Sequence, residues 1–197
     1  MLPTTSAVQI RENKRLMRIN LTQYLNSSPI RIMVSIFNTT TFEENRAFVE
    51  KNKHRIRCIY CSPVELSINI PNDIPLTILE MNNTTNQIVG IGLVMNRPKT
   101  QEYNVYGDGN YNRFQFLGKK RIDRKDMNDE EERIMKIFDN LCFTGTRHLK
   151  RSQGLKSFPV EMLYKVIIGT GFDLVKFIYE MFIRRKPDNS IVTTFVA

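Results

Sequence analysis

The chain contains no tryptophan, only two histidines and only three cysteines among its 197 residues. An odd number of cysteines does not provide the paired framework that stabilises small secreted domains, so we expect reduced thiols. The first ten residues also lack the charged start and apolar core of a signal peptide. We therefore expect an intracellular protein, in the cytoplasm or the nucleus.

Residues suited to catalysis are scarce. His54 and His148 are the only histidines available as bases, and neither lies in a recognisable catalytic motif. A phosphate-binding P-loop is missing, and Gly90-Ile-Gly92 lacks the remainder of a dinucleotide fingerprint. We therefore assign no catalytic residues and predict no cofactor.

Long apolar runs without charge are missing too. The most apolar late stretch, residues 166–183, contains Asp173, Lys176 and Glu180. Charged side chains are costly in a hydrocarbon core, so this stretch predicts a helix of a globular protein and no membrane span.

Positive charge is abundant, with a formal net charge of +9. Because 41% of the residues are hydrophobic and 25% are charged, which are ordinary globular values, the excess belongs to a folded body. A polyanionic partner is expected. Charge alone does not distinguish a nucleic acid from an anionic membrane surface or from the interior of a virion or ribosome.

The chain divides into three parts by composition. Residues 1–29 are polar and basic and predict an N-terminal arm, residues 30–165 predict the core domain, and residues 166–197 predict a C-terminal helix and tail. No internal repeat or low-complexity tract occurs.

Within the core, apolar residues recur with strand and helix periods. Alternating or β-branched runs predict strands, and apolar stripes behind capping or acidic residues predict helices. Gly90 and Gly92 share one face of a strand and leave it bare, so that a helix or a ligand could approach. The fold class is α+β, with a small mixed β-sheet or barrel, inserted helices and a helical C-terminus. The predicted strands are 30–37, 55–60, 76–81, 88–95 and 113–117, and the predicted helices are 41–51, 128–141, one from 160, and 172–185.

Residues 143–156 form a basic run that contains two glycines and no acidic residue. Glycines let backbone amides approach an anion, and Arg and Lys supply charge to a phosphate. The run therefore predicts phosphate contacts of a nucleic acid, against the plainer alternative of a solvated loop. Its candidate contacts are Arg147, His148, Lys150, Arg151 and Lys156, supported by Lys119, Lys120 and Arg121 from a second basic segment.

A zinc site is an alternative use of the cysteines. Cys58 and Cys61 have the spacing of half a site, which Cys142 and His148 could complete. A strand over residues 55–60 would point the first two cysteines to opposite faces, however, and no second close pair exists. We favour cysteines that are buried as small apolar residues.

The strand 75–81, the polar hairpin, the Gly-x-Gly strand 88–94 and the aromatic strand Arg113-Phe-Gln-Phe116 together resemble the sheet of a PUA-like domain, the superfamily of ASCH, EVE and YTH domains. The resemblance covers residues 55–160. It implies a small β-barrel that binds RNA or DNA, in some branches by flipping a base into a pocket. The missing tryptophans exclude the usual Trp-based cage. The resemblance further implies that the loop 147–156 contacts the sugar-phosphate backbone of the nucleic acid and that the loop 96–112 forms the rim of the pocket.

The alternative function is a structural component of a large assembly, such as a virion or a ribonucleoprotein. The polar N-terminal arm and the β-branched segment 191–196 could then pack against protein neighbours.

Overall fold

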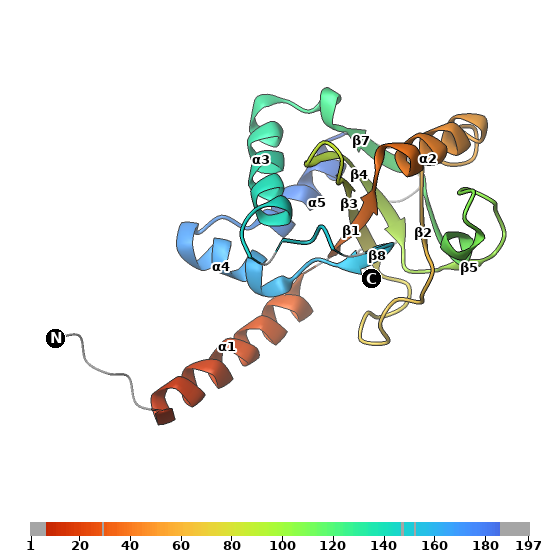
Figure 1. Ribbon diagram of the computed structural model, residues 1–197. Helices are drawn as coiled ribbons and strands as arrows, with labels where there is room; N and C mark the ends of the chain where they lie inside the picture. Colours follow the sequence, from red (N-terminus) through yellow and green to blue (C-terminus); the bar gives the residue numbers. More distant parts are fainter. Residues whose placement is uncertain (1–6, 29, 147, 152, 186–197) are drawn as a thin grey trace.

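The computed structural model describes residues 7–28, 30–146, 148–151 and 153–185. This part of the chain contains both helices and strands, with most of the strands in its middle and helices towards both ends (Figure 1). The elements are α1 (Ala7–Ser27), β1 (Arg31–Phe37), α2 (Thr39–Lys51), β2 (Cys58–Ser62), β3 (Pro75–Asn82), β4 (Gln87–Met95), β5 (Lys99–Thr100), η1 (Gly109–Asn112), β6 (Phe114–Gly118), β7 (Lys120–Asp123), η2 (Arg124–Asp126), α3 (Asp129–Phe143), β8 (Leu155–Ser157), α4 (Val160–Thr170) and α5 (Leu174–Arg184).

The strands form two sheets. A five-stranded sheet has the order β7-β4-β3-β1-β8, in which only β1 and β3 are parallel, and a three-stranded antiparallel sheet has the order β2-β6-β5. Parallel strands need a crossover, and residues 38–74 provide it by carrying α2 and β2 across one face of the large sheet. The predicted mixed α+β class is confirmed. Among the described residues the pairings do not close into a barrel.

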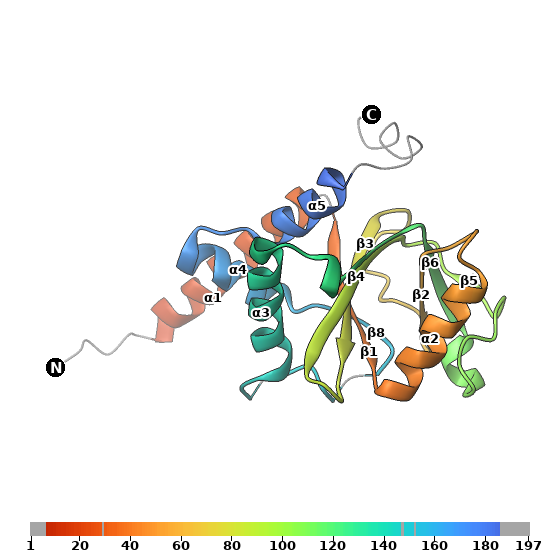
Figure 2. The same cartoon turned by 90° about the horizontal axis from the view of Figure 1, so that it is seen from above.

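The large sheet is the middle layer of the molecule. Helices α1, α3, α4 and α5 lie on one side of it, and α2 with the small sheet lies on the other (Figure 2). Side chains alternate accordingly along β1: Ile32 and Val34 belong to the core under the helices, whereas Met33 and Phe37 belong to the core under the small sheet. Burial on both faces explains why every residue of β3 is buried.

The helix caps follow the sequence signals. The Asn128 side chain accepts a hydrogen bond from the backbone N–H of Glu131, whose carboxylate accepts one from the backbone of Asn128, so a capping box begins α3. Below it, Ile134, Phe138 and Cys142 form a buried stripe. The acidic residues at 129–132 are thus the first turn of a helix, as their position predicts.

Helix α1 was not expected from the composition of residues 1–29. Its residues Met17, Leu21 and Leu25 recur at helical spacing, and it projects away from the body (Figure 1). Its C-terminal part is anchored: Leu21 is buried, and the Tyr24 hydroxyl donates a 3.0 Å hydrogen bond to Asp173, the N-cap of α5. The helical period was thus present in the sequence, but the polar and basic residues around it led to the interpretation as an arm.

The bare face of Gly90 and Gly92 is filled by side chains of the protein itself. Tyr60 crosses from the small sheet and donates a 2.7 Å hydrogen bond to Oε1 of Glu80. Arg121 binds both oxygens of Glu80, at 2.8 and 2.6 Å. A Cβ atom at Gly92 would overlap the Tyr60 hydroxyl, and one at Gly90 would lie 2.7 Å from both charged groups. Glycine is needed here because polar side chains, not a helix or a ligand, occupy the space.

We expect Gly92→Ala to destabilise the protein by about 2–4 kcal/mol, because the new methyl group displaces Tyr60 and leaves buried polar atoms without partners. Urea unfolding followed by far-UV circular dichroism measures this change in the free energy of unfolding. Gly169→Ala is the control, since it lies in α4 with open space around it and should stabilise the helix by up to about 1 kcal/mol. Equal stabilities of the two variants would contradict this description of the interior.

Candidate functional site

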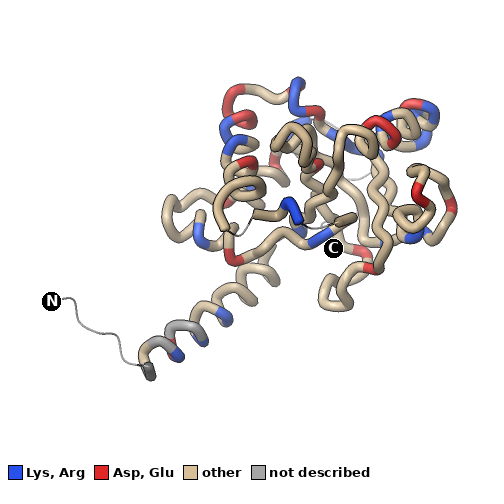
Figure 3. The backbone as a smooth tube through the Cα atoms, viewed as in Figure 1, with Lys and Arg blue, Asp and Glu red and all other residues tan. Residues whose placement is uncertain are grey.

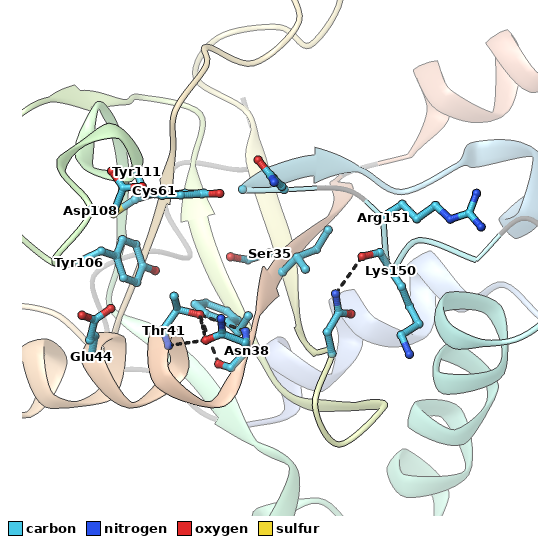
Figure 4. Close-up of a pocket in the computed structure, with 15 residues that line it drawn as sticks. Ser35, Asn38, Thr41, Glu44, Cys61, Tyr106, Asp108, Tyr111, Lys150 and Arg151 are labelled. Carbon is cyan, nitrogen blue, oxygen red and sulfur yellow. Dashed lines mark hydrogen bonds between the residues drawn. The ribbon is translucent and has the colours of Figure 1, made fainter.

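A pocket of about 490 Å³ opens where β1 ends and α2 begins (Figure 4). It lies between the large sheet and the small sheet, so segments distant in sequence share its surface. It is lined by Ser35, Ile36, Phe37, Asn38, Thr41, Glu44, Cys61, Asn83, Tyr106, Asp108, Tyr111, Lys150, Arg151, Gln153 and Gly154.

The floor of the pocket carries buried polar groups with unused hydrogen-bonding capacity. The Tyr106 side chain, in a residue 8% exposed, accepts a 3.1 Å hydrogen bond from the Asn45 amide, but its own hydrogen has no acceptor among the described residues. The Ser35 hydroxyl, in a residue 2% exposed, has no hydrogen bond to another described residue either. Tyr106 and Ser35 face each other across the cavity (Figure 4). A ligand with polar edges could satisfy both groups.

The floor stays electrically neutral at physiological pH. Burial raises the pKa of the Cys61 thiol to about 12, so its sulfur is protonated and is a poor nucleophile. Burial also raises the pKa of the Tyr106 hydroxyl well above its usual value. Both groups therefore act as hydrogen-bonding groups and not as anions.

One wall of the pocket is acidic and aromatic. Glu44, on the second turn of α2, accepts a hydrogen bond of 3.2 Å from the backbone of Gly107, and Asp108 caps η1 by accepting one of 2.9 Å from Asn110. The Tyr111 ring lies edge-on to Tyr106, with 6.4 Å between ring centroids. Apart from Glu44, this wall belongs to the loop 96–112, which the resemblance to PUA-like domains implied as a pocket rim.

The opposite wall is the basic loop. The Asn83 side chain donates a 2.9 Å hydrogen bond to the Lys150 carbonyl and so fastens the loop to the β3–β4 hairpin. Gly154 has φ +67° and approaches Pro63 closely, which requires glycine. Among the described residues no carboxylate pairs with Lys150 or Arg151. Their side chains extend from the rim away from the pocket floor (Figure 4).

The remaining predicted contact residues do not all join this site. Arg147 lies outside the described residues. His148 is partly buried, and its Nδ1 atom has no partner in the part of the chain that is described. Lys156 is exposed on β8, the edge strand next to β1. The basic loop therefore supplies Lys150 and Arg151 to the pocket and Lys156 to the neighbouring edge.

The second basic segment lies elsewhere. Lys120 and Arg121 are part of β7, which is the opposite edge of the large sheet from β8, and Lys119 precedes them. Four strand spacings separate the two edges, which is about 19 Å. Basic positions are accordingly spread over several parts of the molecule (Figure 3). The predicted contacts thus fall on two surfaces and not on one.

Arg121 is engaged inside the protein. Its side chain is 9% exposed and binds Glu80 and Asp123, the latter at 2.9 Å. Burial lowers the pKa of its guanidinium, but the bonds to Glu80 and Asp123 outweigh this effect and raise it. Its charge is neutralised, so Arg121 holds strands together and is not free for a phosphate.

The cysteines do not assemble the alternative zinc site. All three are free and buried, as we expected of small apolar residues. Cys58 and Cys61 belong to the core under the small sheet, whereas Cys142 belongs to the core under the helices. No three His, Cys, Asp or Glu residues are grouped to hold a metal within the described ranges.

Two lining residues, Ser35 and Glu44, were not found from the sequence, because each taken singly has an ordinary structural explanation. Tyr106 and Tyr111 belong to the loop 96–112, which was expected as a pocket rim. Glu44 lies 9 residues after Ser35, and Tyr106 lies 62 residues after Glu44. Their meeting depends on the crossover that places α2 beside the small sheet.

Searches of family models and of curated protein sequences gave no match to this chain. Within the described residues, no helix combines the length and the apolar character needed to cross a membrane. The site is therefore interpreted from its own geometry.

We expect Arg121→Met to destabilise the protein by about 3–5 kcal/mol, because it leaves the Glu80 carboxylate buried without its cation. Lys119→Met, two residues away and exposed, should change the free energy of unfolding by no more than about 0.5 kcal/mol. Urea unfolding of both variants measures the difference. A stable Arg121→Met protein would show that Arg121 is not needed in the interior.

Proposed function

We propose that the protein binds nucleic acid, with a base in the pocket and the sugar-phosphate backbone along the basic loop. The observation that carries the proposal is the adjacency of two features. The buried hydroxyls of Ser35 and Tyr106 face the cavity with hydrogen-bonding capacity that no described residue uses, and Lys150 and Arg151 lie at its rim without an ion pair among the described residues. A nucleotide has the same two parts, a polar planar base and an anionic phosphate.

The dimensions and chemistry of the pocket support a base as occupant. Its volume of about 490 Å³ is within the usual range of small-molecule sites. The hydroxyls on the floor can hydrogen-bond to base edges, and the carboxylates of Glu44 and Asp108 can accept from exocyclic amino groups. Tyr111 offers an aromatic face for stacking.

The outward direction of Lys150 and Arg151 supports backbone contact. Cations that extend along the surface reach phosphates of a strand that passes the pocket, while the neutral floor avoids burying charge without a partner (Figure 4). Such contacts do not depend on base identity, so the proposal covers RNA and DNA alike. The resemblance to PUA-like domains points to the same class of ligand.

We expect the wild-type protein to bind a single-stranded 12-mer with an affinity that falls as salt is raised. Changing Lys150→Ala and Arg151→Ala together should weaken binding about tenfold at low salt and reduce the salt slope by about 1.4, since two phosphate contacts are lost. Fluorescence anisotropy at several salt concentrations measures both quantities.

The matched control is Arg133→Ala with Lys136→Ala, an equal loss of charge on exposed positions of α3. It should bind like the wild type. The proposal is wrong if the wild-type protein does not bind RNA or DNA at low salt, or if the two double variants are weakened equally.

A second candidate function is the assembly component. It is favoured by an apolar surface on α1 and α4, where Leu16 and Ile19 are 49% and 43% exposed and Ile168 is 69% exposed. Leu16 and Ile168 line the same shallow groove between the two helices. Because much of α1 is exposed, this long helix would gain stability by packing its apolar residues against a protein neighbour. The segment 191–196, also expected to pack, lies outside the described residues.

This second function predicts self-association through α1 and α4. Changing Leu16→Glu and Ile168→Glu together should shift the protein to monomer in sedimentation velocity experiments, because charge would be buried in the contact. Ile68→Glu is the control, since Ile68 is exposed on the loop between β2 and β3 and does not line this groove, so its substitution should not affect association. A wild-type protein that stays monomeric at every concentration would exclude contacts between identical copies.

A further inference from the structure

Two basic segments that are distant in sequence meet at one corner of the molecule. Cys58 of β2 pairs with Gly118 of β6, and the backbone of Arg57 donates a 2.8 Å hydrogen bond to the Gly118 carbonyl. The pairing of β2 with β6 ends at these residues, and Lys119 follows Gly118 directly in the chain, so Arg57 and Lys119 lie at the same end of the strand pair. The corner is defined by Arg55, Arg57, Lys119 and Lys120.

The charges at this corner are available to a ligand. Arg55, Arg57 and Lys119 are exposed, Lys120 is partly exposed, and none of the four forms an ion pair within the described residues. The acids nearby are already engaged.

Glu50 binds Lys53 at 2.6 Å and Glu102 binds Lys99 at 2.7 Å. Arg121 is engaged in the same way, by Glu80 and Asp123. The corner therefore keeps a local excess of positive charge that the fold does not use.

Helix α2 connects this corner to the pocket. Its N-cap Asn38 and its residues Thr41 and Glu44 line the pocket, and the chain continues from its last residue, Lys51, to the corner. Thirteen helical residues span about 20 Å. At the 3.4 Å rise per nucleotide of a stacked strand, this distance corresponds to about six nucleotides.

We infer that the corner is a second phosphate-binding surface, which engages the same single strand after it leaves the pocket and passes along α2. This inference rests on the proposed function. It assigns Arg55, Arg57, Lys119 and Lys120 to the backbone about six nucleotides from the base in the pocket. The ligand is therefore a polymer, because a mononucleotide or a very short oligonucleotide cannot reach both surfaces.

The test compares a single-stranded 12-mer with a 3-mer by fluorescence anisotropy at low salt. Changing Arg57→Gln and Lys119→Gln together should weaken binding of the 12-mer about tenfold and lower its salt slope by about 1.4, as two phosphate contacts are lost. Binding of the 3-mer, which reaches only the pocket and the loop, should change less than twofold. Arg133→Gln with Lys136→Gln makes the same chemical change on α3 and should not affect the 12-mer.

Failure of the inference is distinguishable from failure of the proposed function. If the corner variant binds the 12-mer like the α3 control while Lys150→Ala with Arg151→Ala weakens it, the corner is not a contact surface and the pocket site stands. If the wild-type protein does not bind the 12-mer, both are overturned. Equal weakening of the 3-mer and the 12-mer by the corner variant also contradicts a separate second surface.

Discussion

Glu80 and Arg121 form an ion pair in the interior, and both sheets are arranged around it. A buried carboxylate is costly unless hydrogen bonds and an opposite charge compensate it. Here Arg121 supplies two bonds from β7, and Tyr60 supplies one from β2. The missing side chains of Gly90 and Gly92 on β4 leave the required space. The pair therefore links three strands of the large sheet to the small sheet, and its geometry fixes the distance between the two layers.

The pocket depends on the same arrangement. Tyr60 precedes Cys61 of the pocket floor on β2, and the Ile59 carbonyl accepts a 2.7 Å hydrogen bond from the Asn45 side chain that also binds Tyr106. Displacing β2 would thus move α2 and the loop 96–112 together.

The cations of the protein divide into two groups by their partners. Arg121 is neutralised inside, whereas Lys150, Arg151 and the basic corner remain unpaired within the described residues and are available to an anionic ligand.

Sequence periodicity predicted most of the core but little of the site. The strands at 76–81 and 88–95 and the helix at 128–141 were found because a buried face imposes a regular apolar pattern. Short strands such as β5 and β8 contain too few residues for a pattern, and the apolar residues of α1 lie among many polar and basic ones. The basic loop was visible as a local excess of charge. Ser35 and Glu44 were not, because a pocket between two layers depends on contacts that no local pattern encodes.

A titration of ¹⁵N-labelled protein with a single-stranded 12-mer, followed by the backbone amide signals, observes the site most directly. If a base enters the pocket while the backbone follows the basic loop, the signals of Ser35, Tyr106 and Lys150 should shift together and saturate at one equivalent. Signals on the far face, such as Arg133 of α3, should not move. Shifts confined to exposed basic positions, with Ser35 and Tyr106 unchanged, would contradict a base-binding pocket.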